Sequence, residues 1–211
     1  MNNSILDKLE KFIEFDKKNK SSHWNKYLNS KANYNNPFES LGFGGYSKKT
    51  LYKSFFHYIF SILIFGNNIF KSETYKNYKI VFDKSKRQIN VDTIRHIFTF
   101  DLLKTIDPPS NVCVIGDGKC NFVIGNLLTF PNSRIFSINL SETLINDYLL
   151  LKEMKILDDT EIQVIENEHD VILENKKLIL IPSHLKEYLL NKDIDLFVNI
   201  VSFQEMTIDE I

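Results

Sequence analysis

Two glycines and an aspartate follow an apolar run in the middle of the chain. Residues 112–115 are all apolar, Gly116, Asp117 and Gly118 come next, and residues 122–128 have helical spacing. A buried strand that passes through a glycine turn into a helix is the usual cradle for a nucleotide-like cofactor. The glycines let the backbone approach the ligand, and the first helical turn offers free N–H groups. Two glycines also occur in ordinary turns, so this interpretation needs support from the rest of the chain.

Polar residues follow three further apolar runs in the C-terminal half. Residues 134–138, 178–181 and 194–201 have the composition of buried strands. In an open parallel sheet, ligands bind at the carboxyl ends of the strands, near the point where the strand order reverses. The polar side chains beyond these three runs are therefore expected to meet the glycine turn in one crevice. The candidates are Asn139, Glu142, His184, Ser202, Gln204 and Glu205.

The elements that must position these residues alternate along the chain. Helices are expected at residues 122–129, 142–154 and 185–190, with Ser141 or Asn139 as the cap of the second, and a short extra strand at residues 161–165. A β-α-β succession of this kind predicts a Rossmann-like parallel sheet with helices on both faces. The segment Asp107-Pro108-Pro109 ends the preceding helix. The expected organisation is thus a mainly helical region over residues 1–109 and a sheet domain over residues 110–211.

The N-terminal region is expected to be helical over residues 3–20, 48–65 and 84–106. Ser4 can cap the first helix together with Asp7. Arg95 on the third helix is a candidate contact for an anionic group of a substrate, the alternative being a surface salt bridge. Residues 55–66 are the most apolar run but are too short to span a bilayer, which predicts a buried helix or, as an alternative, a helix that lies on a membrane surface.

Composition excludes several classes of protein. The net charge of −1 gives no reason to expect general nucleic-acid binding, although residues 1–111 carry a charge of +8 and residues 112–211 a charge of −9. The two cysteines form no disulfide framework, and no Cys and His residues have the spacing of zinc ligands. The polar, amphipathic N-terminus lacks the apolar core of a signal peptide. These features predict a cytoplasmic protein without a transmembrane segment or a metal site.

Several motifs together resemble class I S-adenosylmethionine-dependent methyltransferases. They are the glycine turn, the strand at residues 134–138 with its polar end, and the segment D-L-F-V-N-I-V-S-F-Q-E-M at residues 195–206. The segments G-F-G-G-Y, K-R-Q-I-N and I-R-H-I-F-T-F are similar, more narrowly, to sugar O-methyltransferases of bacterial surface-polysaccharide synthesis. The resemblance implies S-adenosylmethionine as cofactor and a small-molecule or lipid-linked sugar as substrate.

The resemblance also implies roles for the candidate residues. Gly116, Asp117 and Gly118 would contact the methionine part of the cofactor. The residue that binds the ribose hydroxyls is usually acidic, but this chain has Asn139 there, with Glu142 three residues later. An amide lacks the charge-assisted strength of a carboxylate. The usual third glycine is also missing, because the loop continues with Lys119, Cys120 and Asn121.

Methyl transfer to a hydroxyl needs an in-line approach and a base for the proton. Glu205 and His184 are the candidate bases, while Ser202 and Gln204 are candidates to orient the sugar. Glu205 is alternatively a carboxylate that stabilises a helix N-terminus, and His184 an ordinary loop histidine. Which sugar and which hydroxyl would react is not determined by the sequence.

The expected sheet is short of the roughly seven strands that this resemblance implies. The last predicted strand, at residues 194–201, is apolar and would form an open edge unless another chain covers it. We therefore expect a fragment or a shortened homologue, incomplete at its C-terminus. One alternative is a degenerate domain that serves as a non-catalytic binding module. Another is an NAD-type oxidoreductase, although Asn121 stands where G-x-G-x-x-G requires its last glycine.

Overall fold

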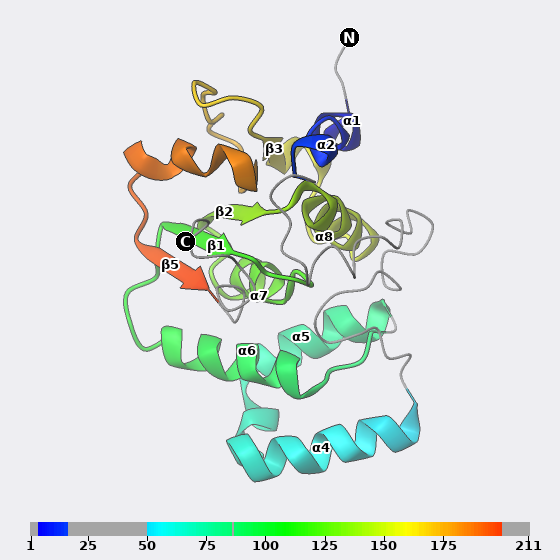
Figure 1. Cartoon of the computed structure of the whole chain (residues 1–211). Coiled ribbons are helices and arrows are strands. Elements are labelled where there is room, and N and C mark those ends of the chain that lie inside the picture. Colours follow the sequence, from blue (N-terminus) through cyan, green and yellow to red (C-terminus); the bar gives the residue numbers. More distant parts are fainter. Residues whose placement is uncertain (1–3, 17–49, 86, 200–211) are drawn as a thin grey trace.

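The computed structural model describes residues 4–16, 50–85 and 87–199, and its centre is a parallel β-sheet (Figure 1). Every pair of neighbouring strands is parallel, and the strand order is β3-β4-β2-β1-β5. The strands are β1 (Asn111–Ile115), β2 (Arg134–Asn139), β3 (Ile162–Val164), β4 (Leu178–Pro182) and β5 (Leu196–Asn199). The expected parallel sheet is confirmed, as is the short extra strand, which forms one edge.

Helices cover the sheet on both faces because alternate side chains of each strand point in opposite directions. Val112 and Val114 share a core with α7 (Asn121–Thr129) and α8 (Ser141–Glu153), the connections that follow β1 and β2. Cys113, between them in sequence, faces a second apolar cluster that includes Tyr188 of η4 (Ser183–Asn191). This burial on both faces explains why the strands read as continuous apolar runs.

The order of the strands reverses at β1. From β1 the chain forms β2, then the edge strand β3, and then β4 between β3 and β2, before it returns to place β5 on the other side of β1. The carboxyl ends of β1 and β5 therefore flank the switch point at which open α/β sheets bind their ligands. The glycine turn lies directly after β1, at this point.

The helices of residues 50–103 lie below the sheet domain in Figure 1. They are α4 (Leu51–Phe65), η2 (Asn67–Lys71), α5 (Glu73–Lys84) and α6 (Val91–Leu103), with α5 and α6 packed on α7, and α4 outermost against α6. The expected helix over residues 84–106 was wrong at its start. Asn90 accepts a hydrogen bond from the backbone N–H of Thr93 and so begins α6 at Val91.

The expected helix over residues 3–20 is interrupted within the described residues. It forms α1 (Ile5–Glu10) and α2 (Ile13–Asp16), and the capping box of Ser4 with Asp7 is confirmed. Leu9 is fully buried in the main core, and α1 packs against α8 and β3, at the end of the molecule remote from α4 (Figure 1). No helix of the described ranges is long and apolar enough to cross a membrane.

Gly125 allows α7 to approach the two helices below it, which yields the first prediction. A Cβ atom at this position would lie 1.9 Å from the Tyr78 hydroxyl and 2.2 Å from Cε2 of Phe100, and both rings are fully buried. We expect Gly125→Ala to lower the free energy of unfolding by roughly 1–3 kcal/mol, because overpacking exceeds the gain in helix propensity. Urea denaturation followed by circular dichroism measures this change.

Gly118→Ala is the matched control for Gly125→Ala. A Cβ atom at Gly118 would meet nothing within 4 Å, and its backbone is not left-handed. The control should therefore unfold close to the wild-type midpoint. Equal stability of the two variants would contradict the packing role assigned to Gly125.

Candidate functional site

The turn after β1 has the backbone shape that a ligand loop requires. Gly116 has a φ of 72°, and its N–H donates to the carbonyl of Ile138, which fixes the turn beside the end of β2. Gly118 leaves open space where a side chain would stand. The first glycine thus sets the conformation of the turn and the second leaves room beside it, as the sequence pattern predicts.

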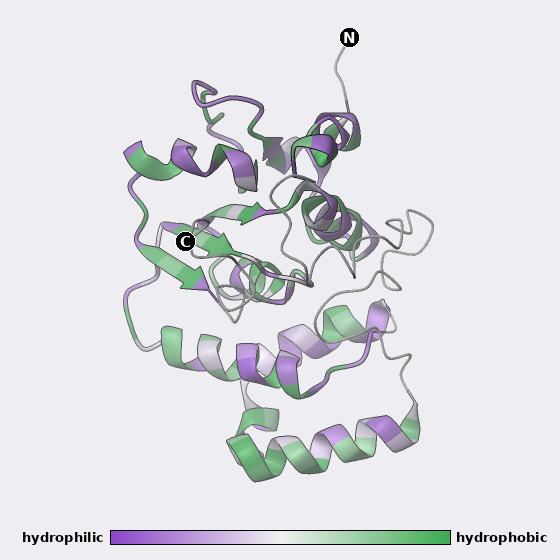
Figure 2. Ribbon diagram, in the orientation of Figure 1, coloured by the Kyte–Doolittle hydropathy of each residue, from purple (hydrophilic) through white to green (hydrophobic). Residues whose placement is uncertain are grey.

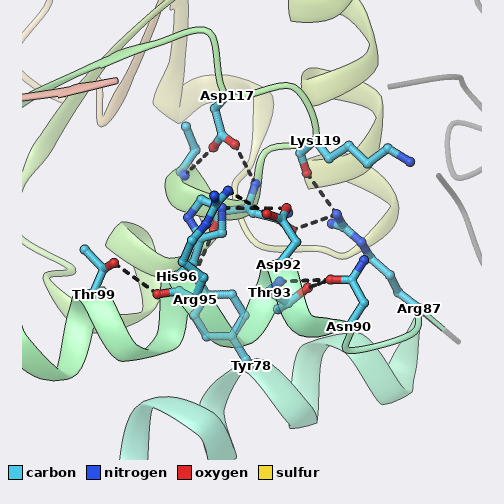
Figure 3. A network of polar contacts seen from close by, with 12 residues as sticks. Tyr78, Arg87, Asn90, Asp92, Thr93, Arg95, His96, Thr99, Asp117 and Lys119 are labelled. Atoms are coloured by element: carbon cyan, nitrogen blue, oxygen red, sulfur yellow. Dashed lines mark hydrogen bonds and ion pairs between the residues drawn. The ribbon is translucent and has the colours of Figure 1, made fainter. Parts of the chain in front are cut away.

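Asp117 caps α7 from within the turn (Figure 3). One carboxylate oxygen accepts from the N–H of Asn121 at 3.1 Å and the other from the N–H of Val123 at 2.9 Å. Burial raises the pKa of Asp117 to about 6, although these hydrogen bonds and Arg87 oppose the shift. The chain's own carboxylate therefore occupies the helix N-terminus at which free N–H groups were expected.

Cys120 takes a backbone conformation that glycine adopts more readily than other residues. Its φ of 57° and ψ of 18° lie in the left-handed region, and its side chain is fully buried in the main core. Left-handed backbone costs a non-glycine residue roughly 1–2 kcal/mol. Position 120 thus has a backbone conformation that favours glycine although its residue is a cysteine.

Asn139 ends β2 beside the glycine turn, since Ile138 and Ile115 are partners in the parallel register. Its Oδ1 accepts from the N–H of Leu140 at 2.9 Å, while its Nδ2 is buried without a hydrogen-bond partner. A buried amide donor without a partner costs free energy until a ligand accepts from it. Asn139 can thus donate to a hydroxyl oxygen at this strand end. Glu142 follows in the first turn of α8.

Arg87 joins the loop to the helical region, and the analysis of the sequence did not select it as a site residue. Its Nη2 donates to the carbonyl of Lys119 at 3.1 Å and to Oδ1 of Asn121 at 2.8 Å (Figure 3). The guanidinium lies 4.6 Å from the centre of the Phe82 ring, and its Nη1 is buried without a partner. Arg87 belongs to the segment K-R-Q-I-N noted in the sequence, but only the fold brings residue 87 to residues 119–121.

Asp147 is a second residue that the sequence did not reveal. It lies on the buried side of α8, and neither carboxylate oxygen has a hydrogen-bond partner. Burial raises the pKa of Asp147 well above its ordinary value, and Asp117 adds to this shift while Arg87 opposes it. A neutral carboxyl group is the form that such surroundings favour.

Arg95 is paired within its own helix. Its Nη2 lies 2.5 Å from Oδ1 of Asp92, which is the surface ion pair weighed as the alternative to substrate binding. Burial, Arg95 and Arg87 together lower the pKa of the neighbouring His96 to about 3, so that this imidazole is neutral. The substrate role of Arg95 stays a prediction and would require this ion pair to open.

His184 lies in η4 against α1 and α2. Its ring is 4.9 Å from that of Phe12 and is stacked on Phe15 at 5.4 Å, and its Nδ1 is 3.6 Å from Asp16. Asp16 also accepts from the backbone N–H of Ser141 at 2.5 Å. The expected cap of α8 was therefore wrong, because the side-chain acceptor at this helix start comes from α2 instead of Ser141 or Asn139.

Three of the predicted residues lie outside the described ranges. They are Ser202, Gln204 and Glu205, and their roles stay predictions. The structure places Gly116, Asp117, Gly118 and Asn139 together at the ends of β1 and β2, with Glu142 nearby in the sequence of α8. Within residues 4–16, 50–85 and 87–199, no three His, Cys, Asp or Glu side chains are grouped to hold a metal ion.

A cavity of about 330 Å³ lies between α4, α5 and α6. Three of its polar lining residues come from α4, and others come from α5 and the segment before α6: Ser54, His57, Ser61, Lys79, Arg87 and Gln88. The rest of the wall consists of one acidic and six apolar or aromatic residues: Asp83, Phe55, Tyr58, Phe70, Tyr75, Ile89 and Ile94. Arg87 is thus shared between this cavity and the loop after β1, and a mixed aromatic and polar wall is suited to a hydroxylated ligand.

Comparisons with models of protein families, with curated proteins and with solved structures found no match.

The burial of Asp117 predicts a pH-dependent stability. Its folded pKa of about 6 exceeds the ordinary value of 3.8, so the folded chain binds more protons than the unfolded chain between these values. Stability is then lost as pH rises through 6. Between pH 5 and pH 8, we expect the free energy of unfolding of the wild type to fall by about 1 kcal/mol relative to Asp117→Asn.

Urea denaturation of both proteins at several pH values checks this difference. Asn at position 117 keeps an acceptor oxygen for α7 but does not titrate. The difference in free energy of unfolding between wild type and variant therefore reports the titration of the Asp117 carboxyl group. Parallel pH profiles for wild type and variant would contradict the raised pKa.

Proposed function

We propose that this chain is an S-adenosylmethionine-dependent methyltransferase that acts on a sugar hydroxyl in surface-glycan synthesis. One observation carries the proposal: the left-handed glycine turn between β1 and α7 lies at the switch point of a parallel sheet. The fold is shared by many activities, so only the properties of the turn and its neighbours can distinguish among them.

The position of Asp117 favours a cationic cofactor over a dinucleotide. A pyrophosphate binds at a helix N-terminus through free N–H groups and the helix dipole. Here the Asp117 carboxylate already accepts from two of those N–H groups, and its pKa of about 6 leaves it mostly ionised at pH 7. A phosphate would meet a negative charge, whereas the sulfonium of S-adenosylmethionine would be attracted. This distinguishes the proposal from an NAD-type oxidoreductase.

Asn139 and Gly118 supply the remaining support for the cofactor site. The buried Nδ2 of Asn139 lacks a partner and can donate to a ribose hydroxyl at the end of β2. Gly118 leaves the space beside the loop open. Asn139 forms a weaker contact than a carboxylate would, and this favours a non-catalytic binding module as the second candidate.

The cavity below the loop is the proposed acceptor region. Arg87 lines it and also holds the backbone of Lys119, so an acceptor bound there is adjacent to the cofactor loop. In the reaction, the hydroxyl oxygen attacks the methyl carbon, the bond from carbon to sulfur breaks, and S-adenosylhomocysteine leaves. The hydroxyl proton passes to a base, for which Glu205 remains the predicted candidate. His184 packs on Phe15 and Asp16, at the end of the molecule remote from α4 (Figure 1), and is too far from this cavity to serve as the base there.

Calorimetric titration with S-adenosylhomocysteine tests the cofactor site. We expect saturable binding to the wild type and none to Gly118→Val, because the new side chain fills the open space beside the loop. A Cβ atom at this position would meet nothing within 4 Å, so the variant should fold, and its melting temperature is measured beside that of the wild type. A folded wild type that binds NADH instead, or neither compound, would refute the methyltransferase. Binding without turnover would favour the non-catalytic module.

Filling the cavity tests the acceptor region. In assays of labelled methyl transfer to a panel of free and nucleotide-linked hexoses, we expect Ser54→Phe to lower turnover at least tenfold and to leave S-adenosylhomocysteine binding unchanged. Ser54 lines the cavity. Ile59→Phe on the outer side of α4 is the matched control and should retain activity. Full activity of Ser54→Phe would place the acceptor elsewhere.

A further inference from the structure

The outermost helix α4 has its polar side turned inward and its apolar side turned outward. Ser54 donates to Oε1 of Gln88 in the body of the protein, and Ser61 is buried. Nine large apolar or aromatic residues of the same helix are exposed, among them Leu63 at 75% and Ile64 at 60%. Figure 2 shows α4 as a mostly hydrophobic helix at the periphery of the molecule. A helix that faces water normally has the opposite orientation.

The exposed apolar surface is broad. At about 100° per residue, the exposed positions from Leu51 through Phe60 to Ile64 cover more than half the circumference of the helix. The surface continues onto α6, because the ring of Phe65 is 5.7 Å from that of Phe98, which is half exposed. A partner helix would cover only a stripe of this arc. A continuous apolar medium would cover all of it.

The charges around α4 indicate what kind of apolar surroundings would cover its exposed side chains. The helix contains no acidic residue, and its single charged side chain is Lys53. Residues 48–86 carry eight Lys against two Asp and Glu, a net charge of +6, and the Nη1 atom of the adjoining Arg87 is buried. A cationic segment with an exposed aromatic and aliphatic helix complements the anionic headgroups and acyl boundary of a bilayer.

We propose that α4 docks in the interfacial plane of an anionic membrane. Its 15 residues are too few to span the bilayer and lie parallel to its surface, with the outer arc in the acyl boundary. The inward polar side then remains in the protein, where it lines the cavity of α4, α5 and α6. This proposal does not depend on methyl transfer. If both hold, the helix that docks on the membrane also lines the acceptor cavity.

Flotation of the full chain with lipid vesicles tests the docking. We expect the wild type to float with vesicles of phosphatidylglycerol and phosphatidylcholine, and at least tenfold less with phosphatidylcholine alone. Raising NaCl from about 0.05 M to about 0.5 M should weaken the binding, because salt screens the attraction of Lys and Arg. Phe60→Ser combined with Leu63→Ser should reduce binding to the anionic vesicles at least tenfold. Both side chains are exposed and lie outside the cavity wall.

Leu173→Ser combined with Leu190→Ser is the matched control, since both residues are exposed apolar side chains remote from α4 in the sequence. This control should float like the wild type, and circular dichroism should show both double variants to be folded. The proposal is overturned if the wild type stays unbound to anionic vesicles, or if both double variants lose binding equally. It is also overturned if light scattering shows that the wild type is a dimer and the Phe60→Ser, Leu63→Ser variant a monomer, while vesicles bind neither the wild type nor this variant.

Discussion

The arrangement of the candidate site depends on the capping of α7 by Asp117. Two hydrogen bonds from the backbone N–H groups of Asn121 and Val123 to its carboxylate hold the turn after β1 against the start of the helix. A helix N-terminus that is buried without acceptors is costly, so the chain supplies its own. The consequence is chemical as well as structural, because the cap places a buried acidic group at this strand end.

The second constraint is the connection between the helical region and the sheet domain. Arg87 binds the carbonyl of Lys119 and the side chain of Asn121, and the hydroxyl of Tyr78 donates to the carbonyl of Asn121 at 2.7 Å. One hydrophobic core runs without interruption from α5 and α6 through α7 and α8 to the sheet. The loop is therefore positioned from both sides, and a ligand in the cavity could influence it through Arg87 without any large movement of the sheet.

Buried polar groups without partners gather around this connection. Nη1 of Arg87, Nδ2 of Asn139 and both oxygens of Asp147 are buried without hydrogen bonds. Such groups reduce stability, and in native proteins they are concentrated where ligands bind. The orientation of α4 is a further feature that does not stabilise the isolated chain. It leaves large apolar side chains such as Leu63 exposed to water.

The sequence by itself determined the parallel sheet, its order of elements and the glycine turn, because apolar runs of strand length and Gly116 with Gly118 are local signals. It also located the end of β2 at Asn139. It could not determine where α6 begins, because the helical pattern of the sequence extends back to residue 84, whereas the side chain of Asn90 caps the helix at Val91. Only the tertiary structure brought Arg87 and Asp147 to the loop and turned α4 outward, because these contacts join residues far apart in the chain, and nothing local to either partner encodes them.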